Sequence, residues 1–221
     1  MRLAPFIDHT ILKQTTTRAD VQTICAEAAQ YCFAAVCVPP VYVADAMGFL
    51  KSSGVKVCTV IGFPFGYHAL SVKMEEAEKA VADGANELDM VLNVAALMSG
   101  DFHILEQEVE ALATFSNAHA RTLKVIIESG ILTDNEIITC CNICKTFPVH
   151  YLKTSTGFAE QGATAHAVQL MRQHLPSTIQ IKASGGIKTA AFAKELVGAG
   201  ATRLGCSASI AIVNEETADT A

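Results

Sequence analysis

The chain has 221 residues, of which 51% are hydrophobic and 17% are charged, and its formal net charge is −6. This composition is typical of a globular protein and excludes an intrinsically disordered one, and the length allows one large domain with a substantial core. The negative charge argues against a general nucleic-acid-binding surface, although it leaves room for a local basic pocket that binds a small anion.

The eight cysteines do not indicate a secreted disulfide scaffold. The first ten residues lack the apolar core of a signal peptide and include the acidic Asp8. Cys140, Cys141 and Cys144 contain a Cys-x-x-Cys spacing, but no second pair follows, so a zinc site is a minor alternative. No apolar run approaches the ~20 residues of a membrane span. We expect a reduced, cytoplasmic protein that uses neither a metal nor another cofactor.

Strand-like apolar runs alternate with amphipathic helix-like runs along nearly the whole chain. Thr17 precedes the first helix as a candidate N-cap, and glycines follow several of the later helices. In chain order, the strands are expected at 6–12, 34–38, 55–63, 87–93, 123–129, 150–156, 179–184 and 203–206. The helices are expected at 17–31, 41–53, 71–83, 101–118, 133–146, 163–174, 189–199 and 207–215.

Eight strand-helix units without an internal linker predict a single-domain (β/α)8 TIM barrel that spans residues 1–221. The small, polar tail at 216–221 is expected to fray. The alternative is a doubly wound open sheet. That fold usually carries Gly-x-Gly-x-x-Gly after its first strand, which is missing here, and eight units would be many for it.

Two of the expected strands carry the same pattern, Lys-x-Ser-x-Gly, at 153–157 and again at 182–186. A lysine inside a strand is unusual, and each one alone could equally be structural. Neighbouring parallel strands lie about 4.8 Å apart, so the amines of Lys153 and Lys182 can be close neighbours. Two like charges at that distance favour the loss of one proton, and a neutral amine attacks a carbonyl to form a Schiff base. The two neighbouring lysines therefore favour a reactive site over a purely structural role.

Other polar side chains fall on the same inward face of their strands, because side chains alternate along a strand. In the fourth strand, the apolar residues alternate with Glu87, Asp89 and Asn93, which are expected to point into the barrel. The predicted barrel centre holds Glu87, Asp89, Lys124, Glu128, Lys153 and Lys182. The alternative to a reactive site is a structural ion-pair network.

Glycines follow the last three strands at Gly157, Gly185, Gly186 and Gly205, and Ser207 opens the last helix. Glycine lets backbone N–H groups approach an anion, and barrels often bind phosphate after strands seven and eight. The alternative is that each glycine only serves a tight turn. Because the glycines cluster on consecutive strand ends, we expect a phosphate site.

Several of these segments together resemble the deoxyribose-phosphate aldolase family. They are Glu-Leu-Asp-Met-Val-Leu-Asn at 87–93, Lys-Val-Ile-Ile-Glu at 124–128, Lys-Thr-Ser-Thr-Gly-Phe at 153–158 and Lys-Ala-Ser-Gly-Gly-Ile at 182–187. Asp-His-Thr at 8–10 and Gly-Phe-Pro at 62–64 fit as well. The resemblance implies a class I aldolase that reversibly cleaves 2-deoxy-D-ribose 5-phosphate to D-glyceraldehyde 3-phosphate and acetaldehyde in deoxyribonucleotide catabolism.

The resemblance also implies roles for individual residues. Lys153 would form the Schiff base, Lys182 would favour the neutral form of that amine, and Asp89 would relay protons. Asp8 and Thr10 would lie near the sugar, with Lys188 as an outer contact. The phosphate turns would be Gly157, Gly185, Gly186, Gly205 and Ser207. The expected partner is a small sugar phosphate rather than nucleic acid or a membrane, and a homodimer or larger homo-oligomer is compatible with the sequence.

The chain departs from the family pattern at two positions. Ala208 stands where some members have a second serine, so one phosphate donor is missing. Some members use a C-terminal tyrosine in proton transfer, whereas this chain ends in Ala221, so water or the Asp89 and Lys182 pair must take that role. Two rival functions stay open: another Schiff-base barrel enzyme, such as a transaldolase, and a barrel that binds a phosphate ligand without catalysis.

Overall fold

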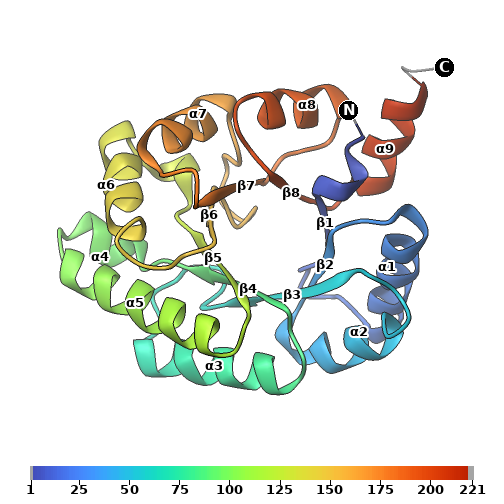
Figure 1. Ribbon diagram of the computed structural model, residues 1–221, viewed down its shortest axis with the longest axis horizontal. Helices are drawn as coiled ribbons and strands as arrows, with labels where there is room; N and C mark the ends of the chain where they lie inside the picture. The colour runs from blue at the N-terminus through green and yellow to red at the C-terminus, as the bar shows by residue number, and fades with distance from the viewer. Residues whose placement is uncertain (1, 219–221) are drawn as a thin grey trace.

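The computed structural model describes residues 2–218, which form a closed barrel of eight parallel strands surrounded by helices (Figure 1). Each strand pairs with the next one in the sequence, and β8 closes the barrel against β1. The predicted (β/α)8 barrel is confirmed, and the doubly wound alternative is wrong.

The strands are short and lie at the centre of the molecule. Their bounds are β1 (Ile7–Thr10), β2 (Ala35–Val38), β3 (Lys56–Ile61), β4 (Glu87–Val91), β5 (Thr122–Ile126), β6 (Tyr151–Lys153), β7 (Gln180–Ser184) and β8 (Arg203–Cys206). The register places Lys153 beside Lys182 and Asp89 beside Lys124, so the charged residues of neighbouring strands lie at the same height.

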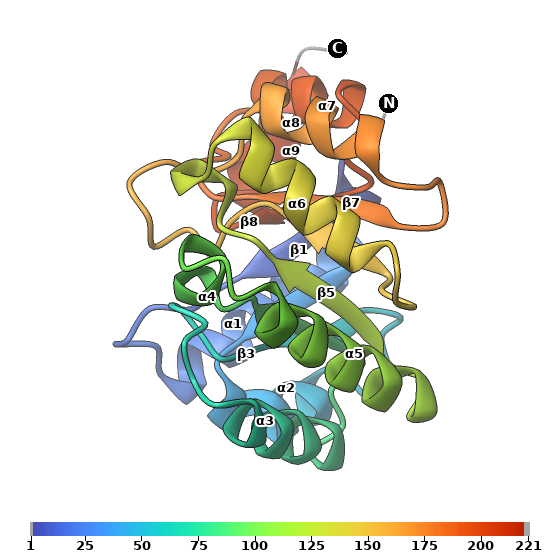
Figure 2. The same ribbon diagram turned by 90° about the vertical axis from the view of Figure 1, so that its left-hand side faces the viewer.

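The helices form the outer ring, which Figure 2 shows from the side. Their bounds are α1 (Arg18–Tyr31), α2 (Val43–Phe49), α3 (Leu70–Ala82), α4 (Val94–Met98), α5 (Phe102–Ala118), α6 (Asp134–Cys144), α7 (Ala165–His174), α8 (Ala190–Gly198) and α9 (Ser209–Ala218). Three 3-10 turns precede β1, α2 and α6: η1 (Ala4–Phe6), η2 (Pro40–Tyr42) and η3 (Ser129–Ile131). No helix among residues 2–218 is both long and apolar enough to cross a membrane.

Side-chain alternation divides the protein interior into an apolar layer and a charged centre. Leu88 and Met90 of β4 are fully buried in the apolar core cluster that includes buried residues of the helices. Asp89 lies between them in the sequence and is equally buried, but it points into the barrel, where it contacts lysines. The prediction that β4 has one apolar and one charged face is confirmed for these residues.

Local sequence signals set most helix starts. Thr17 and Thr133 each form a capping box, in which the threonine side chain accepts a backbone N–H and the acidic residue three positions later bonds back to the cap. Thr164 and Thr189 cap α7 and α8 in the same way, without the reciprocal acidic contact. The predicted starts of these helices therefore lie within two residues of the observed ones.

Two helices differ from the prediction. The helix expected at 41–53 is shorter, because a 3-10 turn occupies Pro40–Tyr42 and α2 ends at Phe49, after which Ser53 bonds back to the carbonyl of Leu50. Helix α4 was not predicted. Asn93 is the N-cap of α4, and its side-chain oxygen accepts the backbone N–H of Ala96. The prediction that Asn93 points into the barrel is therefore wrong.

The end of the chain also differs from the prediction. Helix α9 continues to Ala218, and Glu216 is 5% exposed and accepts the backbone N–H of Leu3. This contact joins α9 to η1, which lies beside it in Figure 1. The expected frayed tail is therefore wrong for 216–218, and 219–221 lie outside the described residues.

Candidate active site

The centre of the barrel holds a cluster of charged side chains joined by ion pairs, here called the central cluster. Among residues 2–218 its members are Asp8, Glu87, Asp89, Lys124, Lys153, Lys182 and Arg203. They come from six strands, and the barrel brings them together although 195 residues separate Asp8 from Arg203 in the sequence. Four cations therefore face three carboxylates.

Asp89 is the hub of the central cluster. Its Oδ2 atom lies 2.7 Å from the amine of Lys153 and 2.7 Å from the amine of Lys182. Its Oδ1 atom accepts the amine of Lys124 at 2.7 Å and the thiol of Cys58 at 3.1 Å. One carboxylate oxygen thus bridges the two lysines that the sequence singles out, which provides a direct path for a proton between them.

The cluster holds most of its members in their charged forms. Burial alone would raise the pKa of Asp89, but Lys124, Lys153 and Lys182 outweigh it and hold the pKa well below the usual value. Burial would likewise lower the pKa of Lys182, whereas the carboxylates of Asp8 and Asp89 raise it above the ordinary lysine value. Lys182 therefore stays an ammonium at neutral pH.

Lys153 differs from the other amines in its surroundings. Its ammonium has one carboxylate partner, Asp89, whereas Lys182 contacts two carboxylates and Lys124 contacts Glu87 and Asp89 more closely than 3 Å. Lys153 is thus the lysine of the cluster with the fewest carboxylate contacts.

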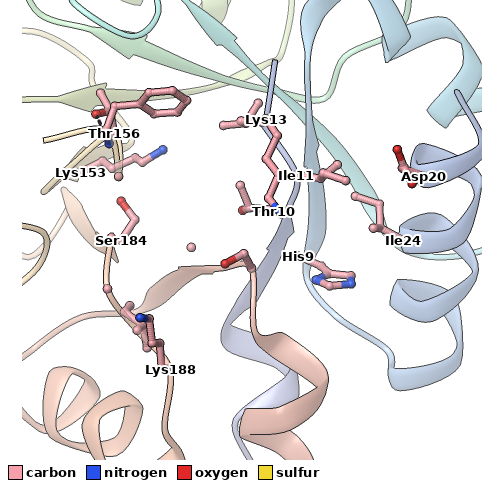
Figure 3. Close-up of a pocket in the computed structure, with 18 of the residues that line it drawn as sticks. His9, Thr10, Ile11, Lys13, Asp20, Ile24, Lys153, Thr156, Ser184 and Lys188 are labelled. Carbon is pink, nitrogen blue, oxygen red and sulfur yellow. Dashed lines mark hydrogen bonds between the residues drawn. The ribbon is translucent and has the colours of Figure 1, made fainter. Parts of the chain in front are cut away.

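A cavity of about 580 Å³ opens above the central cluster. Lys153 is the one cluster member in its lining within the described part of the chain. In the view of Figure 3, Lys153, Ser184 and Lys188 lie on one side of the cavity, His9, Asp20 and Ile24 lie on the other, and Thr10 lies between them. The amine of the nucleophile candidate therefore faces a space large enough for a small sugar phosphate.

The glycine turns form much of the remaining wall. Gly157, Gly185, Gly186, Gly205 and Ser207 all line the cavity. Gly185 and Gly186 have positive φ angles of 87° and 77°, which glycine adopts without strain. A side chain at Gly205 would place its Cβ 2.8 Å from Cβ of Ser184 and 3.2 Å from Cε of Lys182. Ser184 and Lys182 therefore leave no room for a side chain at Gly205, which is a structural reason for glycine there.

Two predicted residues lie outside the cavity lining. Asp8 is fully buried, where it pairs with Lys182 and Arg203, and its place near the sugar stays a prediction. Glu128 lies beyond the end of β5 with a left-handed φ of 54°, and its carboxylate accepts the hydroxyl and backbone N–H of Thr156. It contacts the loop after β6 and does not join the central cluster.

Sequence reasoning missed two members of the site. Arg203 is the partner of Lys182 in the strand register, and its guanidinium bonds Asp8 at 2.6 Å and Glu87 at 3.2 Å. Its alternation with Gly205 along β8 was the signal that could have found it. Cys58 donates its thiol to Asp89, but a cysteine in an apolar strand gives no such signal. All eight cysteines are unpaired thiols in the described residues.

Two overlapping groups of side chains in the described part of the barrel have the composition of a metal site. One is Asp8, Cys58 and Glu87, whose carboxylates pair with Lys182, Lys124 and Arg203. The ligand atoms of Cys37, Cys58 and Asp89 lie within 4.8 Å of one another. However, the ammonium groups of Lys124, Lys153 and Lys182 already occupy both oxygens of Asp89. A metal ion would have to displace these cations, so the donor set does not fit one.

Comparisons with known proteins agree with this geometry. The model of the DeoC/LacD family aldolases matches residues 2–210. A deoxyribose-phosphate aldolase of Exiguobacterium sibiricum is 46% identical over 220 residues, covering 99% of this chain and 99% of that protein. The enzyme of that name from Lactococcus lactis is 45% identical over 219 residues, covering 99% of both chains. The structure of the tetrameric deoxyribose phosphate aldolase from Aeropyrum pernix superposes with a TM-score of 0.91 at 31% identity, covering 97% of this chain and 91% of that chain.

These similarities extend over the barrel strands that supply the central cluster. The alternative of a barrel that binds phosphate without catalysis is wrong, because the matched relatives are aldolases and the protein is therefore an enzyme of the lyase class. The chain belongs to the DeoC/LacD family of aldolases.

Proposed function

We propose that the enzyme is a Schiff-base aldolase that reversibly cleaves 2-deoxy-D-ribose 5-phosphate to D-glyceraldehyde 3-phosphate and acetaldehyde. The observation that carries the proposal is the position of Lys153, which faces the cavity while Asp89 bridges it to the fully buried Lys182. The names of the relatives from Exiguobacterium sibiricum and Lactococcus lactis support the substrate.

The reaction follows from the chemistry of a neutral amine. The amine of Lys153 attacks C1 of the open-chain aldehyde, and loss of water gives an iminium ion. The C3 hydroxyl then loses its proton, the C2–C3 bond breaks, and its electrons form an enamine with the iminium carbon, which releases glyceraldehyde 3-phosphate. Protonation of the enamine at C2 and hydrolysis of the resulting iminium release acetaldehyde and restore the amine.

The central cluster supports the proton transfers of the first step. The nitrogen of Lys153 must lose a proton before and during carbinolamine formation, and the carbinolamine hydroxyl must gain one to leave as water. The Oδ2 atom of Asp89 touches the amines of Lys153 and Lys182, so Asp89 can accept a proton from Lys153 and return it while Lys182 stays charged. This assigns Asp89 the role of relay and Lys182 the role of a permanent neighbouring charge.

The part of the cavity lined by the glycine turns suits the phosphate group. Gly185, Gly186 and Ser207 line it just before the N-terminus of α9, and Lys188 adds a cation to the same lining. Backbone N–H groups and helix N-termini favour a dianion. Ala208 offers no hydroxyl, so we assign phosphate binding to Ser207, Lys188 and the backbone.

A coupled assay with 2-deoxyribose 5-phosphate tests the proposal. We expect aldol cleavage in the native protein, background activity in Lys153→Ala, and a much lower kcat/KM for unphosphorylated 2-deoxyribose. Ser207→Asp should raise KM for the phosphorylated sugar, because it places a negative charge beside the phosphate. Cleavage of another sugar phosphate in preference to this one would support the rival Schiff-base aldolases instead.

The cellular compartment, the pathway and the oligomeric state of the enzyme are part of the same proposal. The unpaired thiols are typical of a reducing compartment, which supports a cytoplasmic enzyme of deoxyribonucleotide catabolism. The relative from Aeropyrum pernix is described as a tetramer, which supports a homo-oligomer here.

A further inference from the structure

His9 is a buried titratable residue that the proposed reaction does not use. It lies on β1, directly beside Asp8, but its ring points away from the barrel centre. The residue is 4% exposed and nevertheless contributes to the lining of the cavity. The ring contacts Phe33 edge-on at a centroid distance of 5.3 Å. A histidine packed this tightly has a fixed orientation.

The two ring nitrogens join two helices. Nδ1 lies 2.9 Å from the hydroxyl of Ser209, the first residue of α9. Nε2 lies 2.8 Å from a carboxylate oxygen of Glu27 on α1. His9 is also the register partner of Cys206, the last residue of β8. Through these contacts, His9 connects β1 and α1 to the turn between β8 and α9, which carries Ser207.

The hydrogen atoms available to this network determine its direction. The hydroxyl of Ser209 has one hydrogen, and it donates this to the carbonyl oxygen of Cys206 at 3.0 Å. Nδ1 of His9 must then donate to the oxygen of Ser209, because that hydrogen is already used. Nε2 lies at hydrogen-bond distance from the carboxylate of Glu27, so the ring is held between α9 and α1.

We propose that His9 is a positioning residue for the phosphate end of the cavity: it fixes Ser209, and thereby the turn with Ser207 and the N-terminus of α9, at the distance that the phosphate requires. The inference rests on the phosphate site proposed above. His9 itself makes no contact with the reacting carbonyl, because Lys153 lies across the cavity from it (Figure 3).

Asparagine and glutamine differ in side-chain length, so substituting each of them for His9 tests the two hydrogen bonds of His9 separately. The amide nitrogen of asparagine stands as many bonds from Cβ as Nδ1 does, and that of glutamine as many as Nε2. His9→Asn therefore keeps a donor for Ser209 and loses Glu27, whereas His9→Gln keeps a donor for Glu27 and loses Ser209. Both variants remove the ring, so each controls for the packing defect of the other.

The measurement is the ratio of kcat/KM for 2-deoxyribose 5-phosphate to kcat/KM for 2-deoxyribose. In His9→Gln and in Ser209→Ala we expect this ratio to fall roughly tenfold, as for one lost hydrogen bond. In His9→Asn the ratio should stay within about twofold of the native value. The double variant His9→Gln/Ser209→Ala should be no worse than either single variant, because both remove the same bond.

Three results would overturn the inference. An equal loss for both sugars would make His9 a purely structural residue. Equal ratios in His9→Asn and His9→Gln would show that the bond to Ser209 does not position the phosphate end of the cavity. Additive effects in the double variant would show the same. Failure of the proposed phosphate site would appear in the native enzyme instead, as a ratio near one, before any variant is made.

Discussion

This protein has two groups of buried charges, and they differ in features that distinguish a structural ion pair from a candidate catalytic site. The first is the central cluster. The second, here called the outer pair, joins Lys73 of α3 to Glu108 of α5 at 2.8 Å, outside the barrel wall. The lysine side chain of the outer pair is 0% exposed and the glutamate side chain is 2% exposed, so burial alone does not distinguish the two groups.

Their composition and surroundings do distinguish them. The outer pair has one cation and one carboxylate, and its remaining bonds go to the backbone: Lys73 donates to the carbonyl of Val91, and Glu108 accepts the N–H of Asn93. These bonds fasten the end of β4, the strand that carries Asp89. The central cluster has an excess cation and opens on a cavity. The outer pair is matched and closed, as a structural ion pair is, whereas the central cluster is unmatched and in contact with a cavity, as the proposed chemistry requires.

The largest expected effect concerns Lys182. Lys182→Met removes the charge beside Lys153 but leaves the nucleophile in place. Asp89 then attracts Lys153 without competition at Oδ2, so more of that amine stays protonated at pH 7. We expect kcat to fall roughly 10³-fold, within the range for a lost acid-base partner, and aldehyde trapping to recover partly at pH 9 to 10.

Lys124→Met is the matched control, because it removes a cation from the other oxygen of Asp89 and disturbs the cluster to a similar degree. Its trapping rate should depend less on pH than that of Lys182→Met. If Lys182→Met trapped acetaldehyde with the native pH profile, burial would govern the reactivity of Lys153, and Lys182 would be reassigned to holding Asp89.

The next effect concerns the stability of the outer pair. Lys73→Met leaves the carboxylate of Glu108 buried without its partner, which should lower the free energy of unfolding by about 3–5 kcal/mol. Urea unfolding followed by circular dichroism measures this change. The double variant Lys73→Met/Glu108→Leu should regain most of the loss, because it leaves no unpaired charge. An unstable double variant together with a stable single one would contradict the structural role.

The smallest effect is the response of stability to acid. The lysines and Arg203 hold the pKa of Asp8 below that of an unfolded aspartate, although burial opposes them. A depressed pKa contributes stability that is present above the unfolded value of ~3.9 and is lost as the pH falls below it. Burial instead raises the pKa of Glu108, against the attraction of Lys73, so that group contributes with the opposite sign.

Measuring the free energy of unfolding between pH 3 and 6 therefore tests whether Asp8 and Glu108 contribute to stability with opposite signs. The difference between native protein and Asp8→Asn should shrink by about 1 kcal/mol as the pH falls through this range, whereas the difference for Glu108→Gln should not shrink. A constant difference for Asp8→Asn would mean that its carboxylate gains nothing from Lys182 and Arg203.

The sequence predicted the features that repeat and missed those that depend on a single tertiary contact. Alternation of apolar and charged residues was enough to place Asp89, Lys124, Lys153 and Lys182 inside the barrel, because every strand follows the same rule. Asn93 and Glu128 broke the rule since their strands end before them, and each side chain bonds a neighbouring loop or helix instead.

The remaining gaps have the same origin. The bond from His9 to Ser209 spans 200 residues, and no local pattern in either segment announces it. The pairing of Asp8 with Lys182 and Arg203 likewise depends on the closure of β8 against β1, and the place of Asp8 near the sugar stays a prediction. The roles of the glycine turns stay predictions until a phosphate is shown to bind there.

The most direct test of the central claim is borohydride reduction in the presence of acetaldehyde, followed by peptide mass analysis. Only an amine that forms a Schiff base becomes irreversibly alkylated. The account predicts a single added two-carbon group on Lys153, and no labelling of the barrel in Lys153→Ala. Labelling of Lys182 or Lys124 in the native enzyme, with Lys153 unmodified, would contradict it.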